Sequence, residues 1–430
     1  MRSFVIACLT VASGAGIAFG DRPNIVLIMA DDLGADAIGC YGGEGGETPV
    51  LDQLAADGIR FTQCYSQPLC TPTRVQIMTG KYNFRNYTDF GYLNPDETTF
   101  ADVLKEAGYR TGVFGKWQLS GSGREYPAHA DPSDWGFDEY CLWQLNFRPG
   151  HGNKGSRYWD PKLEDRAGII ETSADDFGPD IFVERLCGFI SQESAKPFFA
   201  YFPMAITHDP FVPTPEQTSA PTADHTSSNP KYFPDMVAYT DTMVGRIVKQ
   251  LDDLGLRENT ILIFTTDNGT SSRVVMSTVE GTVRGAKGQM NREGMWVPLI
   301  VNWPGHVEAG QVTDRLVDFT DVLPTLMAVA KIDAAPDQTL DGLPFLASQG
   351  DLPKIEREWI YSWYDPKHSK NVGRYKGVMA ADRTHQLFLK GKWLRRWDGE
   401  PFADGDREAA RKKLQPVLDR YAAQGGVMSE

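Results

Sequence analysis

An excess of basic residues and any long uninterrupted apolar segment are both missing from this sequence. Its 430 residues include 43 Lys and Arg against 57 Asp and Glu, which gives a formal net charge of −14. Binding to nucleic acid requires a basic surface that neutralises phosphates, so this balance argues against a nucleic-acid-binding protein. No segment beyond residue 20 approaches the roughly 20 apolar residues of a membrane-spanning helix, so we expect no stable membrane insertion.

The first twenty residues are unlike the rest of the chain. Arg2 is their only charged residue, residues 4–12 are mostly apolar, and residues 13–20 are mostly small. This pattern is typical of a secretory signal peptide. We therefore expect residues 1–20 to be removed and the mature protein to be periplasmic or secreted.

Cysteine is scarce, and its number is odd once this segment is set aside. Five cysteines follow residue 20, namely Cys40, Cys64, Cys70, Cys141 and Cys187. An odd number in an oxidising compartment suggests that one cysteine has a role other than pairing. Their spacing matches no disulfide framework, so we expect the other four to be buried free thiols.

What the sequence does contain is an alternation of apolar strands and amphipathic helices. The predicted strands cover 24–30, 111–114, 197–202 and 260–266, and the predicted helices cover 100–107, 181–190 and 236–254, with another starting at Pro49 after an N-cap at Thr48. Such alternation indicates an α/β fold, with a large mixed, mostly parallel sheet sandwiched by helices.

The pattern changes after about residue 340. Short segments at 359–363, 374–380 and 386–393 are typical of antiparallel strands, and a charged helix is predicted at 406–421. We therefore expect a main domain at 21–340 and a smaller α+β subdomain at 341–430.

Polar residues follow the predicted strands at the point where each strand ends. They are Asp31 and Asp32, Lys116, His208, and Asp267 with Asn268. Ligands of such sheets bind outside the carboxyl ends of the strands, so these residues point to one site. The Asp-Asp and Asp-Asn pairs offer oxygen ligands, which suit Ca²⁺ or Mg²⁺. Either pair alone is also a common turn sequence.

The segment from Cys70 to Arg74 is the second candidate. Pro72 favours the first turn of a helix, which places Cys70 at a helix N-terminus, where an anion is stabilised. Arg74, four residues on, reaches the same face. In the alternative interpretation Cys70 is a buried thiol and Arg74 a surface charge.

These residues belong to a wider set of motifs. The set comprises Cys70-Thr71-Pro72-Thr73-Arg74 with Thr79-Gly80, Pro23-Asn24-Ile25-Val26 through Asp31-Asp32-Leu33-Gly34, Thr48-Pro49, Gly115-Lys116-Trp117, Thr265-Thr266-Asp267-Asn268-Gly269, Arg284-Gly285 with Lys287-Gly288, and Trp303-Pro304-Gly305. In this combination the chain resembles the formylglycine-dependent sulfatases of the alkaline phosphatase superfamily, over roughly residues 23–330.

The resemblance implies a role for each matching residue. Cys70 would be oxidised to formylglycine by a formylglycine-generating enzyme, and the hydrated aldehyde would attack sulfur. Arg74 would hold this nucleophile, and one divalent ion, usually Ca²⁺ and less often Mg²⁺, would be bound by residue 70 with Asp31, Asp32, Asp267 and Asn268. Lys116 and Lys287 would bind the sulfate, and His208 would protonate the leaving alcohol. The implied substrate is a sulfated carbohydrate or an aryl sulfate.

One position departs from the family pattern. Gln118 stands where a histidine is common, and glutamine cannot act as a base. Either another group acts as the base, His129 or His151 being conceivable, or the intermediate collapses without a dedicated base. Gln118 itself would only orient the nucleophile. Two rival functions remain. A phosphodiester or phosphonate hydrolase of the same superfamily could use the same nucleophile and one metal ion, and Gln118 suggests a catalytically impaired protein that binds sulfated glycans.

Two further segments allow two interpretations each. Aromatic residues are dense from Trp135 to Trp159, where they suit a sugar ring or pack an excursion from the sheet. Basic residues gather between 367 and 376. They would form either an ordinary solvated surface or a surface that attracts a polyanionic glycan.

Overall fold

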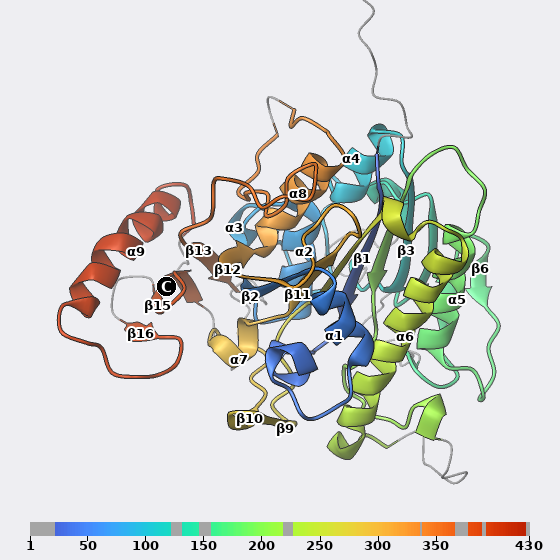
Figure 1. Ribbon diagram of the computed structural model, residues 1–430, viewed down its shortest axis with the longest axis horizontal. Helices are drawn as coiled ribbons and strands as arrows, with labels where there is room; N and C mark the ends of the chain where they lie inside the picture. Colours follow the sequence, from blue (N-terminus) through green and yellow to red (C-terminus); the bar gives the residue numbers. More distant parts are fainter. Residues whose placement is uncertain are drawn as a thin grey trace, which may run out of the picture.

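A computed structural model describes residues 22–121, 131–145, 156–217, 227–335, 338–365, 377–388 and 393–426. A ten-stranded sheet runs through the molecule in the order β12-β2-β11-β8-β1-β7-β3-β4-β5-β6 (Figure 1). Its strands are β1 (Asn24–Ala30), β2 (Ile59–Tyr65), β3 (Arg110–Lys116), β4 (Glu139–Trp143), β5 (Leu163–Asp165), β6 (Gly168–Ile170), β7 (Phe198–Pro203), β8 (Thr260–Thr266), β11 (Leu299–Asn302) and β12 (Gln311–Asp318).

The centre of this sheet is parallel. β8, β1, β7, β3 and β4 are neighbours that all run in the same direction. β11 and β5 are antiparallel to the strands beside them. The predicted mixed, mostly parallel sheet is therefore confirmed, and the carboxyl ends of its five central strands lie along one edge.

Two hydrophobic cores cover the two faces of the sheet. Alternate residues of β1 belong to opposite cores. Ile25, Leu27 and Met29 lie in the first, and Val26, Ile28 and Ala30 lie in the second. The first core is shared with α2 (Cys70–Thr79), α4 (Phe100–Glu106) and α8 (Val322–Val329), and the second with α1 (Pro49–Ala56), α5 (Gly178–Ile190) and α6 (Phe233–Asp253). The helices thus sandwich the sheet, as predicted.

The start of α1 differs from the expectation in one respect. The Thr48 side chain makes no capping hydrogen bond to α1; its hydroxyl instead accepts one from the Gly39 amide at 2.9 Å. The cap comes from α6, since the carboxylate of Asp241 accepts hydrogen bonds from the amides of Val50 and Leu51 at 3.0 and 2.8 Å. Thr48 is the N-cap residue and Pro49 the first residue of α1, as predicted, but the capping hydrogen bonds come from a distant carboxylate that binds two amides at once.

A second, four-stranded antiparallel sheet lies at one end of the molecule with the last helix (Figure 1). It contains β13 (Ile360–Tyr364), β14 (Gly377–Ala381), β15 (His385–Phe388) and β16 (Leu394–Arg396), and α9 (Asp406–Ala422) packs on it. Of the segment predicted as a strand at 386–393, residues 386–388 belong to β15 and Trp393 directly precedes β16, while residues 389–392 lie outside the described residues. The smaller elements are α3 (Asn83–Asn86), α7 (Arg292–Met295) and the hairpin of β9 (Val275–Thr278) and β10 (Gly281–Arg284).

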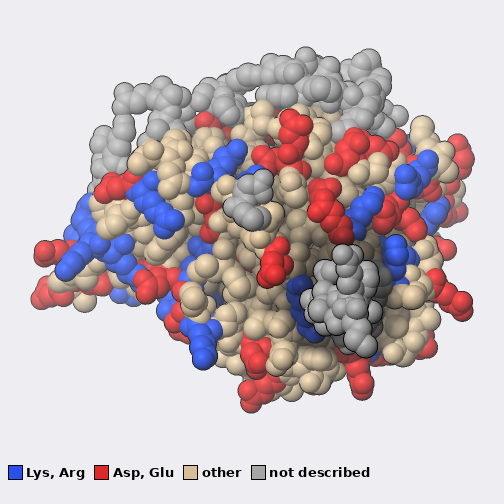
Figure 2. Space-filling view, turned by 90° about the horizontal axis from the view of Figure 1, so that it is seen from above, with Lys and Arg blue, Asp and Glu red and all other residues tan. Residues whose placement is uncertain are grey.

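The surface carries charge of both signs. In Figure 2, Lys and Arg side chains gather at the end of the molecule where α9 lies in Figure 1. α9 supplies Arg407, Arg411, Lys412, Lys413 and Arg420. The basic run at 367–376 lies outside the described residues. Within the described part of the chain, no helix is both long and apolar enough to cross a membrane.

A buried ion pair joins the smaller sheet region to the main one. Arg357, 5% exposed, donates from Nε to Asp321 Oδ2 at 2.8 Å and from Nη1 to the Tyr82 hydroxyl at 2.9 Å. Asp318, also buried, lies close to the same arginine. Removing Arg357 would leave buried carboxylates without a counter-charge.

Arg357→Ala is therefore expected to lower the free energy of unfolding by about 3–5 kcal/mol, as measured by urea denaturation. The matched control is Arg383→Ala. Arg383 pairs with Glu356 at 3.2 Å on the surface, and its loss should cost less than about 1 kcal/mol. Equal effects of the two substitutions would contradict this assignment.

Candidate active site

The predicted site residues do lie together at the carboxyl edge of the sheet. Asp31 and Asp32 follow β1, and Asp267 and Asn268 follow β8, the strand beside it. Lys116 is the last residue of β3. His208 follows β7, which lies between β1 and β3.

Asp31 is the most densely contacted carboxylate of the site. It is fully buried, and Lys116 Nζ lies 2.8 Å from both of its oxygens. Arg157 Nη1 donates to Asp31 Oδ2 at 3.2 Å, and Arg74 Nη2 lies 3.6 Å from Oδ1. Burial alone would raise the pKa of Asp31, but these cations, Lys116 foremost, hold it well below its ordinary value.

Asp32 lies between Lys287 and His208. Lys287 Nζ donates to Asp32 Oδ2 at 2.6 Å, and His208 Nε2 lies 3.6 Å from the same oxygen. Asn268 Nδ2 donates to Asp32 Oδ1 at 2.9 Å. Lys287 is positioned by its neighbour, because the Gly288 amide donates to the Pro68 carbonyl, two residues before Cys70.

The donor set fits a divalent cation. Asn268 Oδ1 is buried and has no hydrogen-bond partner among the described residues, so an acceptor is left for a ligand. Oxygens of Asp31 and Asp32 and a ring nitrogen of His208 lie within 4.8 Å of one another. Burial, together with the charge of Asp31, raises the pKa of Asp267 to about 7. The raised pKa reflects the free-energy cost of ionising Asp267 in this buried place beside Asp31. A bound cation would offset that cost, and oxygen ligands favour Ca²⁺ or Mg²⁺.

Cys70 is the first residue of α2 and is 3% exposed. Arg74, one turn further on, is buried and donates from Nη2 to Asp267 Oδ2 at 2.8 Å. Both Arg74 and Lys287 are within electrostatic reach of Cys70. The interpretation of Arg74 as a surface charge is therefore wrong: it joins the helix that begins at Cys70 to the acidic residues of the site.

His208 is neutral in this arrangement. Burial lowers its pKa to about 3, although Asp32 opposes this shift. Its Nδ1 is hydrogen-bonded to the carbonyl oxygen of Asp209. A neutral ring must donate from Nδ1 in that bond, which leaves Nε2 as the nitrogen that faces Asp32.

Three non-glycine residues at the carboxyl ends of the parallel strands have a left-handed backbone. Asp32, Gln118 and Gln144 have φ of 62°, 56° and 57°. The Gln118 amide donates to the Gln144 carbonyl at 3.3 Å. Such backbone strain costs on the order of 1–3 kcal/mol and clusters at functional sites. Gln118 thus lies at the site edge, two residues after Lys116, while His129 and His151 are outside the described residues.

Arg157 is a site residue that the sequence analysis missed. It pairs with Asp31, and its guanidinium carbon lies 3.9 Å from the centre of the Trp143 ring. The aromatic segment around it is structural where it is described, since Trp135, Tyr140, Trp143 and Tyr158 are buried. The packing interpretation of these four residues is confirmed.

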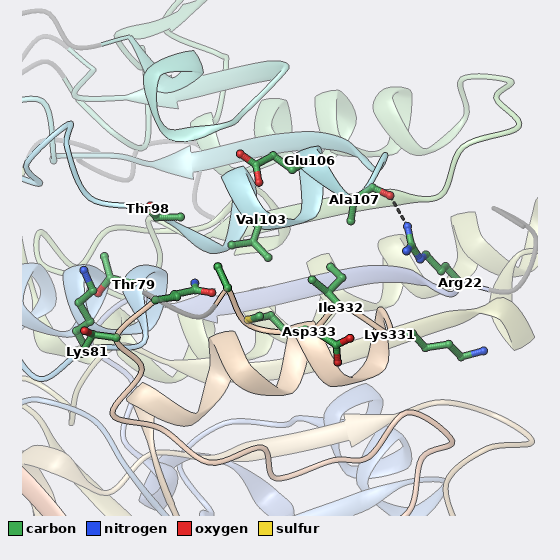
Figure 3. A pocket seen from close by; sticks show the side chains of 14 residues that line it. Arg22, Thr79, Lys81, Thr98, Val103, Glu106, Ala107, Lys331, Ile332 and Asp333 are labelled. Carbon is green, nitrogen blue, oxygen red and sulfur yellow. Dashed lines mark hydrogen bonds between the residues drawn. The ribbon is translucent and has the colours of Figure 1, made fainter. Parts of the chain in front are cut away.

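A separate cavity of about 660 Å³ lies at the far end of α2 (Figure 3). Thr79, the last residue of α2, lines it together with the ends of α4 and α8. The helical rise of about 1.5 Å per residue places Thr79 some 14 Å from Cys70. This cavity is therefore distinct from the acidic site.

The described cysteines are all unpaired. Cys64, Cys70 and Cys141 are buried, while Cys40 and Cys187 are half-buried. The expectation of free thiols is confirmed, and that of burial holds for Cys64 and Cys141.

Comparisons with known proteins agree with this geometry. Residues 23–332 match the family model described as Sulfatase, and residues 286–391 match that of N-sulphoglucosamine sulphohydrolase, C-terminal. The chain belongs to the sulfatase family. It is 34% identical to human arylsulfatase A over 413 residues, covering 86% of this chain and 77% of that protein. It is 30% identical to human N-acetylgalactosamine-6-sulfatase over 385 residues, covering 82% and 71%.

Solved structures share the fold of this sulfatase. One, in complex with its substrate D-glucosamine-2-N,6-O-disulfate, superposes with a TM-score of 0.73 at 20% identity, covering 94% of this chain and 98% of that one. A phosphonate monoester hydrolase of Agrobacterium radiobacter gives 0.68 at 20% identity, with coverage of 94% and 96%. At these identities the likeness establishes the fold, and family membership makes the chain a sulfuric ester hydrolase.

Proposed function

We propose that this sulfatase hydrolyses a sulfate ester on a sulfated carbohydrate, with a nucleophile made from residue 70 and one divalent metal ion. The observation that carries the proposal is the position of Cys70. It begins a buried helix whose Arg74 contacts Asp267, and Gly288, the neighbour of Lys287, donates a hydrogen bond to Pro68 just before Cys70. A cysteine with two cations and an acidic cation site beside it is suited to an anionic substrate.

Two groups would be added to the chain. Formylglycine at position 70 would supply a hydrated aldehyde as nucleophile, and a Ca²⁺ ion would polarise a sulfate oxygen and favour the ionised nucleophile. Asp31, Asp32, Asp267 and Asn268, with residue 70, would hold the ion. Ca²⁺ is preferred over Mg²⁺ because these rigid, all-protein oxygen donors leave little room for the waters that Mg²⁺ keeps.

The remaining side chains act on the substrate. Lys116 and Lys287 bind the sulfate oxygens and stabilise the negative charge that develops as the ester bond breaks. Arg74 orients residue 70. His208, at the edge of the site, would first take up a proton at Nε2, the nitrogen that faces Asp32, and then give it to the leaving alcohol.

The test has two stages. Peptide mass spectrometry across Cys70, on protein made with and without a co-expressed formylglycine-generating enzyme, should show a lighter, aldehyde-reactive peptide only with that enzyme. The modified, calcium-loaded protein should then hydrolyse 4-nitrophenyl sulfate faster than an aryl phosphodiester or phosphonate. Cysteine that persists in the presence of the enzyme would contradict the nucleophile.

Gln118→Ala is expected to lower kcat about tenfold, because one hydrogen bond to the nucleophile, worth roughly 1–1.5 kcal/mol, would be lost. Alanine shares the backbone constraint of glutamine at a φ of 56°, so the free energy of unfolding should change little. Turnover of 4-nitrophenyl sulfate measures the effect. Wild-type turnover would remove Gln118 from the site.

The rival functions remain as outcomes of the same assay. Faster turnover of the phosphonate would favour the phosphonate hydrolase, and binding of sulfated sugars without turnover would favour the impaired binding protein. Export is proposed from the signal-like residues 1–20, which lie outside the described residues. Sequencing the amino terminus of the mature protein tests it.

A further inference from the structure

We propose that Arg157 recognises a second anionic group on the leaving-group side of the substrate. The preferred substrate would then be a sugar that carries another sulfate or a carboxylate besides the sulfate ester that is cleaved. This inference rests on the proposed function and specifies the substrate of the same site.

The guanidinium of Arg157 is held in one orientation with donors to spare. Trp143, 3% exposed and the last residue of β4, stacks against it at 3.9 Å. One nitrogen, Nη1, donates to Asp31 Oδ2. Among the described residues Arg157 makes no other hydrogen bond. A planar guanidinium fixed by an aromatic ring is pre-organised for a planar or tetrahedral anion.

The segment that carries Arg157 packs against the segment that carries His208, and this bears on which part of the substrate Arg157 meets. The hydroxyl of Tyr158, the next residue, donates to the carbonyl oxygens of Ala205 and His208. His208 is the group placed to protonate the leaving alcohol. Arg157 therefore lies on the side of the leaving sugar.

The charge balance of the site points to the same conclusion. Asp31, Asp32 and Asp267 bring three negative charges, while Arg74, Lys116, Lys287 and Arg157 bring four positive ones. A divalent cation and the ionised nucleophile would together raise the excess to two positive charges with His208 neutral, and a sulfate monoester would reduce it to one. Without Arg157 no positive charge would be left over. The positive charge that Arg157 adds would be neutralised by a second anionic group on the substrate.

The competing explanation is that Arg157 only positions Asp31. The two roles differ in selectivity, since a positioning residue affects every substrate alike. The experiment uses the calcium-loaded, formylglycine-containing protein and measures inhibition of 4-nitrophenyl sulfate hydrolysis. The competitors are matched monosulfated and disulfated glucosamine, galactosamine and fucose, with sulfated hexuronates as the carboxylate arm.

In the wild type, a dianionic sugar of at least one matched pair should bind about tenfold tighter than its monosulfated partner, the value of one charge-assisted hydrogen bond. Arg157→Gln should abolish that advantage, and Arg157→Lys should retain part of it. The control is Arg185→Gln, which removes an equal charge from the surface pair with Asp165 and should leave the ratio unchanged. The arm that shows the advantage identifies the group as sulfate or carboxylate.

Any of three results would overturn the proposal. The first is a wild-type affinity ratio near one for every matched pair. The second is an affinity advantage of the dianionic sugar that survives in Arg157→Gln. The third is a loss of affinity in Arg157→Gln that is equal for both members of each pair. Absence of any 4-nitrophenyl sulfate hydrolysis by the modified wild type would instead contradict the proposed function.

Discussion

Replacing Cys70 by alanine is expected to reduce hydrolysis of 4-nitrophenyl sulfate by about 10⁴-fold or more, because loss of a nucleophile removes the covalent step entirely. Cys70 is 3% exposed at the first position of α2, so the smaller side chain fits without displacing the helix. Lys116, Lys287 and His208 would remain in place, and binding of sulfated sugars should therefore persist. Initial rates and equilibrium binding, measured on the same preparation, check both halves of this prediction.

The matched control is Cys187→Ala. Cys187 is a free, half-buried thiol of α5, and its replacement should leave turnover within about twofold of the wild type. A Cys70→Ala variant that retained a tenth of the wild-type rate would show that residue 70 is not the nucleophile. Parallel loss in both variants would point to general damage from cysteine removal.

The sequence predicted those parts of the site that depend on local pattern. β1 and β8 have the bounds that were expected, because each is a continuous apolar run that ends at polar residues. Parallel central strands bring their carboxyl ends to one edge by geometry alone. The meeting of Asp31, Lys116 and Asp267 follows from these two facts.

Contacts between distant segments could not be predicted in this way. Arg157 meets Asp31 across 126 positions of the chain, and its own segment has no strand or helix periodicity to place it. Asp241 supplies the capping hydrogen bonds of α1 across about 190 positions, although Thr48 is the N-cap residue. The flanking strands β2 and β12 were missed because polar residues interrupt them, as their half-buried sides require.

Removal of the divalent cation is expected to lower sulfate-ester hydrolysis at least about 100-fold, since charge stabilisation by a metal ion contributes several kcal/mol to the transition state. Dialysis against a chelator, followed by titration with Ca²⁺ or Mg²⁺, should restore activity with Ca²⁺ at lower concentration. The unmodified chain offers an independent readout. Ca²⁺ at 100 times its dissociation constant adds about 2.7 kcal/mol to stability, which raises Tm by a few degrees.

Two variants decide whether that shift arises at the acidic site. Asp32→Asn removes a buried carboxylate that pairs with Lys287, and the calcium-dependent rise in Tm should disappear. Asp404→Asn removes an equal charge from an exposed position and should keep the rise. A shift that survives Asp32→Asn would place the ion elsewhere. Full activity after chelation would exclude a metal from the reaction, and Asn268 Oδ1 would then be a buried acceptor with no cation to satisfy it.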